Sequence, residues 1–440
     1  MNILGFLPRL TASSTLVYHR VRVLALYNTL ALAAKPLALG WAAWYGRDPR
    51  RARECAQRMA RELPDPLAGS IWLHGASVGE ARLVSALSAL LGERFPSRSQ
   101  AVSAVTGTGL GQLPDIGPRF ILPFDFSGYP TRILQRLDPC LLVLVETELW
   151  PNLIHETAAA NVPIALVSAR LAPERMARYR RWSALYRPLL ERIEIVGAQT
   201  REDAERFESL GAPAGAIRVT GNLKYDLAPP RIDRKSLERR MGTSDGRPVW
   251  IAGSTRPGEE AIVLEAFEVL RRSFPDLLLI LAPRHLDRVD EVLTLARKNW
   301  DAAAWSSPGT GSDSRHAIVV IDTLGELAAL YGIASIAFVG GSLKPFGGHS
   351  PLEPAAAGVP VLVGPHTDHF DEAVRGLVDG GGARRVTDAV DLAATASAWL
   401  ADPALRQRAG RAAHGSISAH TGALERTLDA IAAIVERGAR

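Results

Sequence analysis

The amino-acid sequence predicts an α/β protein of two doubly wound domains, each built on a parallel sheet with helices on both faces. Its 440 residues are enough for two domains of roughly 150–200 residues each. From Ser70 onward, short apolar runs alternate with amphipathic stretches. This pattern stops once, at a polar and proline-rich segment over residues 226–248, and then starts again. Continuous apolar strands separated by helices are typical of a parallel sheet that is buried on both faces.

Each half of the chain supplies its own strand-like runs. In the first half they are IWLHG, AVSAV, RFILPF, CLLVLVE, PIALVSA, IEIVGAQ and IRVTGN. Helix-like stretches lie between most of them, as at Glu80–Leu91, Pro151–Ala160 and Thr200–Leu210. In the second half the runs are VWIAGST, LLLILAPR, AIVVID, IAFVGGS and VPVLVGP. We expect the two halves to face a cleft with the carboxyl ends of their strands, where doubly wound folds bind ligands.

Positive charge is concentrated at the N-terminal end. Residues 1–61 hold ten Lys and Arg against two acidic residues, a net charge of +8, although the whole chain carries only +5. A nucleic-acid binder would show a basic face on its folded body, so we expect no nucleic-acid partner.

The same end is apolar and predicts a membrane anchor at residues 1–46. Val23–Tyr45 is close to the ~20 residues that span a bilayer, it contains Tyr and Trp, and arginines follow at once. No convincing cleavage site is present, and a positive C-terminal flank argues against secretion. We therefore expect an uncleaved anchor with the main body on the cytoplasmic side. An ordinary buried helix is the alternative, and a spanning or an in-plane helix fits equally well.

No pattern for a protein-held catalytic metal is present. The two cysteines, Cys55 and Cys140, form no framework and favour a reducing compartment. D-x-D, H-E-x-x-H and clustered Cys/His ligands are absent, as are G-x-G-x-x-G and a P-loop. We expect no metal and no cofactor, with any nucleotide bound by loops at strand ends.

In the second half, candidate binding residues follow predicted strands. Ser254 and Thr255 end one strand run ahead of a helix, and small residues at a helix start favour an anion. Arg284 ends another, where a guanidinium suits phosphate. Gly341 and Ser342 lie in a glycine-rich run and are additional candidates. Alternatively, Arg284 forms a surface ion pair, and the run from Ser350 to Glu353 is only a helix capping box.

In the first half, the run IWLHGASVGEAR has two interpretations. Gly75–Gly79 spells G-x-S-x-G, which would make Ser77 the nucleophile of a hydrolase. In another frame, Ser77–Glu80 spells S-x-x-E, a capping box without chemistry. Glu80 itself would point from a strand end toward the cleft.

Three more charged residues of this half follow strand-like runs. Glu146 and Glu148 end a hydrophobic strand, where unpaired carboxylates cost free energy and need a partner or a function. Lys224 is a candidate cation near the cleft. The alternatives are helix N-terminal charge for the glutamates and a solvated linker position for Lys224.

Taken together, these segments resemble one family. HGASVGE, ETELWPNLI, GNLKYD, GSTRPGEE, APRH, LGEL and FVGGSLKPFGGHSPLEPAAAGVPVLVGPHTDHF follow in the order seen in 3-deoxy-D-manno-octulosonic acid (Kdo) transferases. These are lipid A glycosyltransferases of Gram-negative bacteria, and the resemblance runs from the N-terminal anchor to about residue 370. It implies the glycosyltransferase B (GT-B) fold.

The resemblance also implies roles for individual residues. Glu80 matches the family's proton acceptor, and Glu146 and Lys224 match residues that assist the transition state. The family's CMP contacts match Pro283, Arg284, Leu324, Gly325, Glu326, Ser350, Pro351, Leu352 and Glu353.

The implied reaction is transfer of Kdo from CMP-Kdo to a hydroxyl of the lipid A precursor, lipid IVA, with inversion. A carboxylate base for that hydroxyl typically contributes about 10²–10⁴-fold to the rate. The expected location is the cytoplasmic face of the inner membrane, with membrane lipid as a partner and the oligomeric state left open. The expected domains are an anchor at 1–46, an acceptor domain at 47–225, a linker at 226–248 and a CMP-Kdo-binding domain at 249–440. The last helix is a candidate to pack back on the acceptor domain.

Two segments depart from the family pattern. His349 and Ser350 stand where the family commonly has His-Asn, so a contact that needs the amide would be lost although Ser still caps a helix. The segment after Arg170 lacks the usual serines, which leaves any acceptor contact there open.

Three other functions are alternatives. Another nucleotide-sugar transferase of the same fold fits the strand-end residues. A serine hydrolase fits less well, because the H-G-G-G oxyanion motif is absent and no particular histidine is indicated. A non-enzymatic membrane scaffold would not explain polar residues at so many strand ends.

Overall fold

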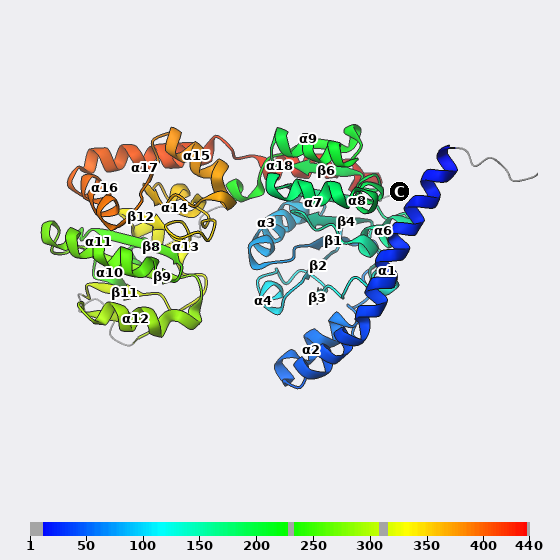
Figure 1. Cartoon of the computed structure of the whole chain (residues 1–440), viewed down its shortest axis with the longest axis horizontal. Coiled ribbons are helices and arrows are strands. Elements are labelled where there is room, and N and C mark those ends of the chain that lie inside the picture. Colours follow the sequence, from blue (N-terminus) through cyan, green and yellow to red (C-terminus); the bar gives the residue numbers. More distant parts are fainter. Residues whose placement is uncertain (1–11, 228–232, 308–315, 438–440) are drawn as a thin grey trace, which may run out of the picture. The chain divides into compact units, whose positions relative to one another are not determined.

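The computed structural model describes residues 12–227, 233–307 and 316–437, with side chains from residue 23 onward, and it divides into two compact units (Figure 1). Of the described residues, the first unit comprises 12–227 together with 421–437, and the second comprises 233–307 and 316–420. Each contains a seven-stranded sheet in which all described strand pairs are parallel, and most of the strands are buried on both faces, as continuous apolar runs require. The predicted α/β class with two doubly wound halves is confirmed.

In the first unit the strand order is β3-β2-β1-β4-β5-β6-β7, a doubly wound arrangement. The strands are β1 Ile71–His74, β2 Gln100–Ala104, β3 Arg119–Ile121, β4 Leu141–Val145, β5 Ile164–Ala169, β6 Ile195–Ala198 and β7 Ile217–Val219. The helices are α1 Ala12–Tyr45, α2 Pro49–Arg58, α3 Val78–Arg94, α4 Gly107–Leu110, α5 Tyr129–Leu137, α6 Pro151–Ala159, α7 Met176–Arg181, α8 Ser183–Leu190, α9 Arg201–Leu210 and α18 Ala423–Arg437.

Alternate side chains of these strands build two cores. Trp72, Leu142 and Leu144 point to the face covered by α5, α6, α8 and α9. Leu73 and Val143 point to the opposite face, which α3 and α18 cover. The two layers of helices leave only the strand ends accessible, so polar residues placed there lie at the edge of the sheet.

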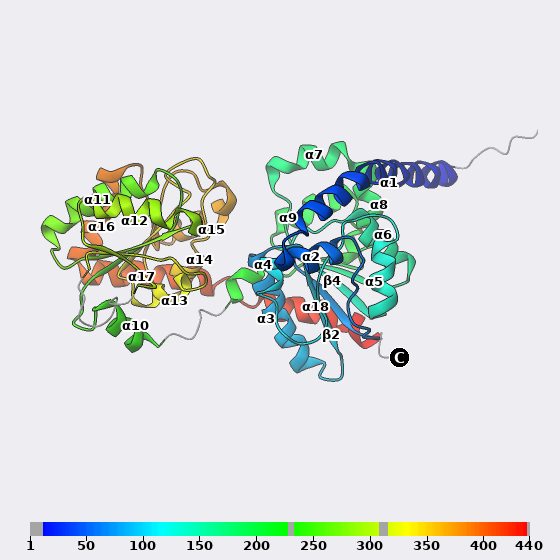
Figure 2. The same cartoon turned by 90° about the horizontal axis from the view of Figure 1, so that it is seen from below.

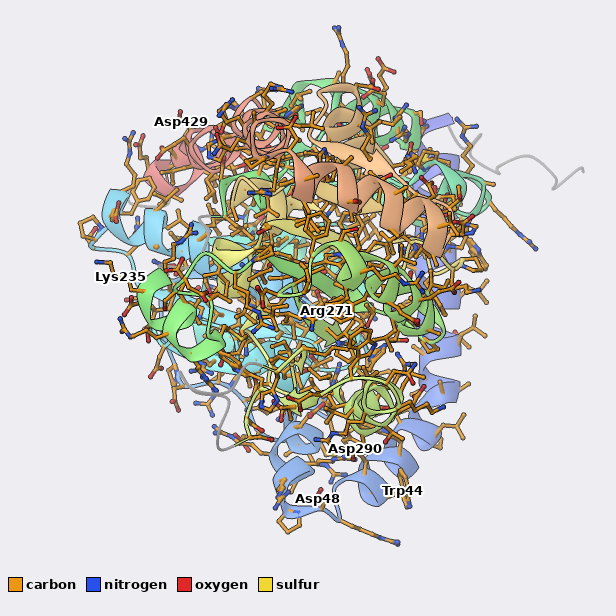
Figure 3. The ribbon with its side chains drawn as sticks, turned by 90° about the vertical axis from the view of Figure 1, so that its left-hand side faces the viewer. Trp44, Asp48, Lys235, Arg271, Asp290 and Asp429 are labelled. Carbon is orange, nitrogen blue, oxygen red and sulfur yellow. The ribbon has the colours of Figure 1, made fainter. Side chains whose placement is uncertain are left out.

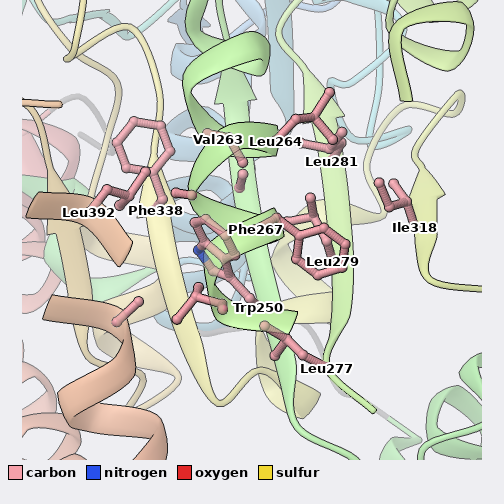
Figure 4. Close-up of a cluster of buried hydrophobic side chains, with 14 of the residues drawn as sticks. Trp250, Val263, Leu264, Phe267, Leu277, Leu279, Leu281, Ile318, Phe338 and Leu392 are labelled. Carbon is pink, nitrogen blue, oxygen red and sulfur yellow. The ribbon is translucent and has the colours of Figure 1, made fainter. Parts of the chain in front are cut away.

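In the second unit the strand order is β10-β11-β9-β8-β12-β13-β14. The strands are β8 Val249–Thr255, β9 Leu278–Pro283, β10 Ala302–Ala304, β11 Ile318–Val320, β12 Ile336–Val339, β13 Val361–Val363 and β14 Ala383–Arg385. The helices are α10 Arg234–Met241, α11 Glu259–Ser273, α12 Val289–Arg297, α13 Leu327–Leu330, α14 Leu352–Ala356, α15 Asp371–Asp379, α16 Ala389–Ala401 and α17 Pro403–Ser418. Trp250, Phe267 and Phe338 are central to its larger core (Figure 4).

Two strands and the linker differ from the expectation. The edge strands β10 and β14 were not predicted, because they are three residues long and carry alanine and arginine rather than β-branched or aromatic side chains. The expected linker 226–248 contains α10. Asp233 caps this helix through the Ser236 N–H, and its last residue, Met241, is buried in the core of the second unit.

The C-terminal end of the chain belongs to the first unit, not to the expected domain 249–440. Leu428, Ile431 and Val435 of α18 are buried in the core on the α3 face of the first sheet. The same helix contacts β6 and the short 3₁₀ helix η3 (Leu223–Asp226). It also lies beside α3, as Figure 2 shows. The last helix therefore returns to the unit that contains the expected acceptor domain.

The predicted anchor forms α1, whose Val23–Tyr45 segment has a mean hydropathy of 1.4 and is the described helix long and apolar enough to cross a membrane. It is not the ordinary buried helix of the alternative. One of its faces packs on α8 and α2, whereas Leu30, Leu37 and Trp44 are 59%, 77% and 67% exposed. Trp44 lies near the C-terminal end of the helix (Figure 3).

Candidate functional site

Glu80 and Ser77 form a capping box where β1 ends and α3 begins. The Ser77 Oγ accepts the Glu80 N–H at 3.4 Å, which confirms the predicted cap. In return, Oε2 of Glu80 accepts the N–H groups of Ala76 and Ser77. Both amides use the same oxygen, so the Glu80 carboxylate is held in place by Oε2 while neither amide occupies Oε1.

The surroundings of Ser77 do not support a hydrolase. The histidine nearest in sequence, His74, is fully buried, and its Nδ1 contacts the Ser103 Oγ at 2.9 Å rather than Ser77. Burial lowers the pKa of His74 to about 3, so this imidazole stays neutral. Within the described part of the chain, the contacts of Ser77 explain one role only, that of a helix cap.

Glu146 and Lys224 form an ion pair at the end of the neighbouring strand β4. The Glu146 Oε1 lies 2.5 Å from the Lys224 Nζ, and both side chains are partly exposed. Glu146 has φ = 64°, in the left-handed region that non-glycine residues rarely adopt. Such strain costs of the order of 1–3 kcal/mol and concentrates at functional sites. In this left-handed conformation the chain leaves the strand after Val145, and the carboxylate of Glu146 lies at the edge of the sheet.

Lys224 is positioned by contacts on both sides of its short 3₁₀ helix η3. The Asn222 Oδ1 accepts the Lys224 N–H at 3.0 Å, and the Ser168 Oγ accepts the Leu223 N–H at 3.4 Å. Asp226, at the other end, accepts the N–H groups of Gly422 and Leu424, where α18 begins. The returning C-terminal helix thus fastens the segment that carries Lys224.

Glu148 completes a group of three carboxylates at this edge. Its Oε2 accepts the Trp150 Nε1–H at 2.6 Å and lies 3.9 Å from the buried Nε2 of His74. Burial, followed by the charges of Glu80 and Glu146, raises the pKa of Glu148 to about 7. Burial and the charge of Glu146 also raise the pKa of Glu80. A partly desolvated carboxylate with a raised pKa is a better proton acceptor than an ordinary glutamate.

The raised pKa of Glu148 predicts a stability change with pH. The folded state holds this proton up to about pH 7, whereas an unfolded glutamate loses it near its model value of 4.5. As pH rises between these values, the unfolded state binds fewer protons than the folded state, so this group lowers the free energy of unfolding. The total is on the order of 3 kcal/mol at most. We expect the denaturation midpoint of Glu148→Gln to differ least from that of the unsubstituted protein at pH 4.5 and to exceed it most at pH 8.

The matched control is Glu208→Gln, on the exposed side of α9. Urea midpoints of the three proteins in detergent, measured from pH 4.5 to 8.5, check the prediction. A Glu148→Gln difference that does not grow with pH would contradict the raised pKa.

In the second unit, a pocket of about 110 Å³ brings together several of the residues predicted to bind a ligand. Ser254, Pro283, Arg284, Leu324 and Gly325 line it. Arg284 is exposed, and Ser254 has φ = 57°, a second left-handed residue at a strand end. Glu326 follows Gly325 directly and is in the N-cap position of α13, whereas the run from Ser350 to Glu353 does not line this pocket.

Three of the additional candidates have internal partners instead. Gly341 and Ser342 donate their N–H groups to Glu259, which is fully buried and also accepts those of Leu343 and Arg256. The hydroxyl of Thr255 donates to Glu260 at 2.9 Å. A carboxylate of the protein thus accepts the amides of Gly341 and Ser342, and the roles of Thr255, Gly341 and Ser342 as ligand contacts stay predictions.

The run from Ser350 to Glu353 starts a short helix. The Ser350 Oγ accepts the Leu352 N–H at 3.4 Å, and α14 begins at Leu352, with Pro351 in the cap position rather than inside the helix. The charge of Glu353 acts on the buried Tyr331, whose pKa is raised mainly by burial. Pro351 and Leu352 are buried.

Cationic side chains gather beside the pocket. His349 is surrounded by Arg284, Arg256, His369 and His285, whose charges, together with burial as the larger cause, lower its pKa to about 4. Arg256 was not predicted as a site residue. The sequence pattern that pointed to Arg284 also applies to Arg256, because each arginine directly follows a strand. Over the described ranges, no three His, Cys, Asp or Glu residues gather in a way that could hold a metal ion.

The sequence matches one protein family and several of its members. The family described as "3-Deoxy-D-manno-octulosonic-acid transferase (kdotransferase)" matches residues 45–227. The 3-deoxy-D-manno-octulosonic acid transferase of Haemophilus influenzae is 34% identical over 422 residues, 93% of this chain and 98% of that protein. The transferase of Bordetella pertussis is 38% identical over 389 residues, 85% of this chain and 89% of that protein.

The fold also has a counterpart among solved structures. A crystal structure of UDP-N-acetylglucosamine 2-epimerase matches 85% of this chain and 97% of its own chain, with a TM-score of 0.58 and 16% identity. This likeness concerns the fold and supports the GT-B class. With the extent and identity of the two bacterial transferases, the conclusion is direct: the chain belongs to the family of 3-deoxy-D-manno-octulosonic acid transferases, which are glycosyltransferases of lipopolysaccharide synthesis.

Proposed function

We propose that the protein transfers Kdo from CMP-Kdo to a hydroxyl of the lipid A precursor, lipid IVA, with inversion. The observation that carries the proposal is the grouping of Glu80, Glu146 and Lys224 at one edge of the first sheet, on the ends of β1 and β4 and on η3. The three residues come from motifs that resemble those of the family. In the proposed step, the hydroxyl oxygen bonds to the anomeric carbon while the bond to the phosphate breaks, and the proton passes to the base.

Glu80 is the proposed base. Its Oε2 is held by the amides of Ala76 and Ser77, so Oε1 is the atom that accepts the hydroxyl proton. Burial and the nearby Glu146 raise its pKa, which increases its affinity for the proton in the transition state. Because the holding amides belong to the start of α3, the base needs no rearrangement of its backbone.

Glu146 and Lys224 are proposed to act together on the transition state. The ammonium of Lys224 lies 2.5 Å from Glu146, so this edge carries a fixed cation beside two further carboxylates. A preorganised cation stabilises negative charge that develops during transfer, without the cost of reorganising solvent. Glu146 in turn orients the ammonium.

The second unit is proposed to bind CMP-Kdo, with the Arg284 guanidinium on the phosphate. The pocket beside Pro283, Leu324 and Gly325 is the proposed place of the nucleotide, because these positions resemble the family's CMP contacts. The arginine supplies the positive charge that departure of CMP requires, so the proposal includes no metal and no cofactor.

We also propose that α1 attaches the protein to the cytoplasmic face of the inner membrane by lying in the plane of the bilayer. Its inner face is fixed to the first unit: the Tyr27 hydroxyl donates to the partly buried Asp125, and Trp41 packs edge-on against Phe124. Residues 27 to 41 cover about 21 Å of helix. Crossing a hydrocarbon core of about 30 Å would carry polar parts of the first unit into the lipid.

The exposed surface near α1 has the chemistry of an anionic lipid interface. Leucines and Trp44 line the outer side of the helix, and Arg47, Arg50, Arg51 and Arg53 follow it and are exposed. Each cation near an anionic leaflet contributes about 1 kcal/mol. An acceptor that is itself a lipid explains why the unit with Glu80 carries this surface.

Vesicle binding tests the attachment. We expect Leu30→Glu/Leu37→Glu to lower partitioning into phosphatidylglycerol-containing vesicles by at least about tenfold, because two leucines no longer enter the lipid. Val390→Glu, at a residue 73% exposed on α16 of the second unit, is the matched control and should bind normally. Protease added outside the vesicles should remove an N-terminal tag, because the tag and the folded units are then on the same side of the bilayer. A tag protected inside the vesicles would show that α1 spans the bilayer.

Product analysis tests the function itself. The full-length protein in detergent, given CMP-Kdo and a tetraacyl lipid A precursor, should yield a product heavier by at least one Kdo in mass spectrometry, together with free CMP. Proton NMR of the purified product gives the anomeric configuration. Absence of transfer under these conditions would overturn the proposed function, and retention of configuration would overturn the inverting mechanism.

A further inference from the structure

Arg256 and Arg284 follow two neighbouring strands at the same level. Thr255, the last residue of β8, is the register partner of Pro283, the last residue of β9. The Arg284 N–H donates to the Thr255 carbonyl at 3.0 Å, so the two chain segments stay together beyond the strands. Adjacent strands lie about 4.8 Å apart. The two arginine side chains therefore start from adjacent points at one edge of the second sheet.

The side chain of Arg256 is held by its neighbours but not neutralised. Its guanidinium stacks over the ring of Phe346, 4.6 Å from the centroid, and its Nη1 contacts the Nε2 of His285. Its Nε is buried and has no hydrogen-bond partner among the described residues. A buried N–H without an acceptor costs free energy, which a ligand oxygen would recover.

His349 adds a second unsatisfied nitrogen to the same place. Its ring lies so close to Gly341 that a Cβ there would be 2.9 Å from the Cδ2, and its Nε2 is buried without a hydrogen-bond partner in the described ranges. The guanidiniums of Arg284 and Arg256 both act on it with positive charge. The cluster is thus an electropositive site with two unused polar nitrogens.

Two acidic side chains at this edge, those of Glu259 and Glu260, are engaged elsewhere. Glu259 is saturated by the amides of Gly341, Ser342, Leu343 and Arg256, and it binds the backbone of Arg256 rather than its guanidinium. Glu260 forms a two-pronged contact with Arg288 at 2.7 and 3.2 Å. Neither arginine forms an ion pair with a described side chain, so both charges remain available to an anionic ligand.

We propose that Arg256 and His349 form a second anion subsite, distinct from the phosphate position at Arg284, which binds the carboxylate of the transferred sugar acid. This inference rests on the proposed function, because it takes CMP-Kdo as the donor. In that donor the carboxylate and the phosphate oxygen are attached to the same anomeric carbon. Two guanidiniums that start from adjacent strand ends match two anions joined through one atom.

The subsite gives a physical reason for selecting a sugar acid. An ordinary hexose lacks the carboxylate, and its binding would leave the Arg256 and His349 nitrogens unsatisfied beside uncompensated positive charge. Sites built to bind a charged group reject analogues that lack it, because the unpaired groups stay buried. Phe346 keeps the guanidinium flat against its ring, which reduces the rotamer freedom that the arginine loses on binding.

The test separates the two anions of the donor. We would measure KM for CMP-Kdo and the inhibition constant of CMP, which has the phosphate but no carboxylate, with the full-length protein in detergent. Arg256→Gln should raise KM for CMP-Kdo at least about tenfold, equivalent to about 1.4 kcal/mol, with CMP inhibition changed less than twofold. Arg284→Gln should weaken both. His349→Ala should behave as Arg256→Gln with a smaller effect.

Arg411→Gln, at an exposed arginine of α17, is the matched control and should change neither constant. Thermal unfolding of each variant verifies folding. Arg256→Lys keeps the charge but not the planar set of N–H donors, so its KM for CMP-Kdo should lie between those of Arg256→Gln and the unsubstituted protein. An unchanged KM in Arg256→Gln, or an equal loss of CMP and CMP-Kdo affinity, would overturn the subsite while leaving the proposed function intact. Failure of the unsubstituted protein to transfer Kdo would instead overturn the proposed function and the subsite together.

Discussion

Glu80→Gln is expected to lower kcat by about 10²–10⁴-fold while the affinity for CMP stays unchanged. Glutamine has nearly the shape of glutamate and can still accept the N–H groups of Ala76 and Ser77, so the capping box at the start of α3 is kept. What it lacks is a basic oxygen at the position of Oε1. The loss therefore reports on proton transfer rather than on folding.

Steady-state transfer rates and CMP titration by calorimetry measure the two quantities separately. Ser77→Ala provides the control from the same capping box. It should cost about 0.5–2 kcal/mol of stability and leave kcat within a few-fold of the unsubstituted enzyme. Near-normal turnover in Glu80→Gln would remove Glu80 as the base, and a folded but inactive Ser77→Ala would restore the serine as a catalytic candidate.

Lys224→Met is expected to lower kcat by about 10²–10³-fold, the usual effect of removing one preorganised electrostatic group. Methionine keeps the length of the stem, but the ammonium that lies 2.5 Å from Glu146 is lost. Glu146 is then left without its cation beside Glu80 and Glu148, whose pKa values its charge already raises. Some loss of stability should accompany the loss of rate.

A double substitution distinguishes a catalytic cation from one that only balances charge. Lys224→Met/Glu146→Gln removes both charges and should restore stability without restoring turnover. Recovery of turnover in the double variant would show that Lys224 only neutralises Glu146. Lys235→Met, at an exposed lysine of α10 labelled in Figure 3, is the control and should be fully active.

Local patterns predicted the parts of this protein that depend on neighbours in sequence. The apolar run that forms β4 predicted a strand buried on both faces, and the S-x-x-E spacing predicted the cap formed by Ser77. Both features are decided within a few residues, by burial and by the unpaired N–H groups of a helix start. The edge strand β10 was missed because three alanines carry no such signal.

Contacts between distant segments could not be predicted in the same way. Glu259 begins α11, but its carboxylate accepts the N–H groups of Gly341 to Leu343, which lie 82 to 84 residues away. A glycine-rich loop in the sequence looks the same whether a ligand or a buried glutamate occupies it. The ion pair between Lys224 and Glu146 likewise depends on the order of the strands. The motif resemblance named both residues but not their contact.

The return of α18 to the first unit has a consequence for biosynthesis. This helix follows the whole second unit in the chain, yet Asp226, beside Lys224, accepts its first N–H groups. On the ribosome, the first unit therefore waits for about 190 further residues before its core and the Lys224 segment can be completed, roughly 10–40 s at usual elongation rates. During that interval the apolar surface that α18 covers is open, and the partly made chain is not yet a working transferase.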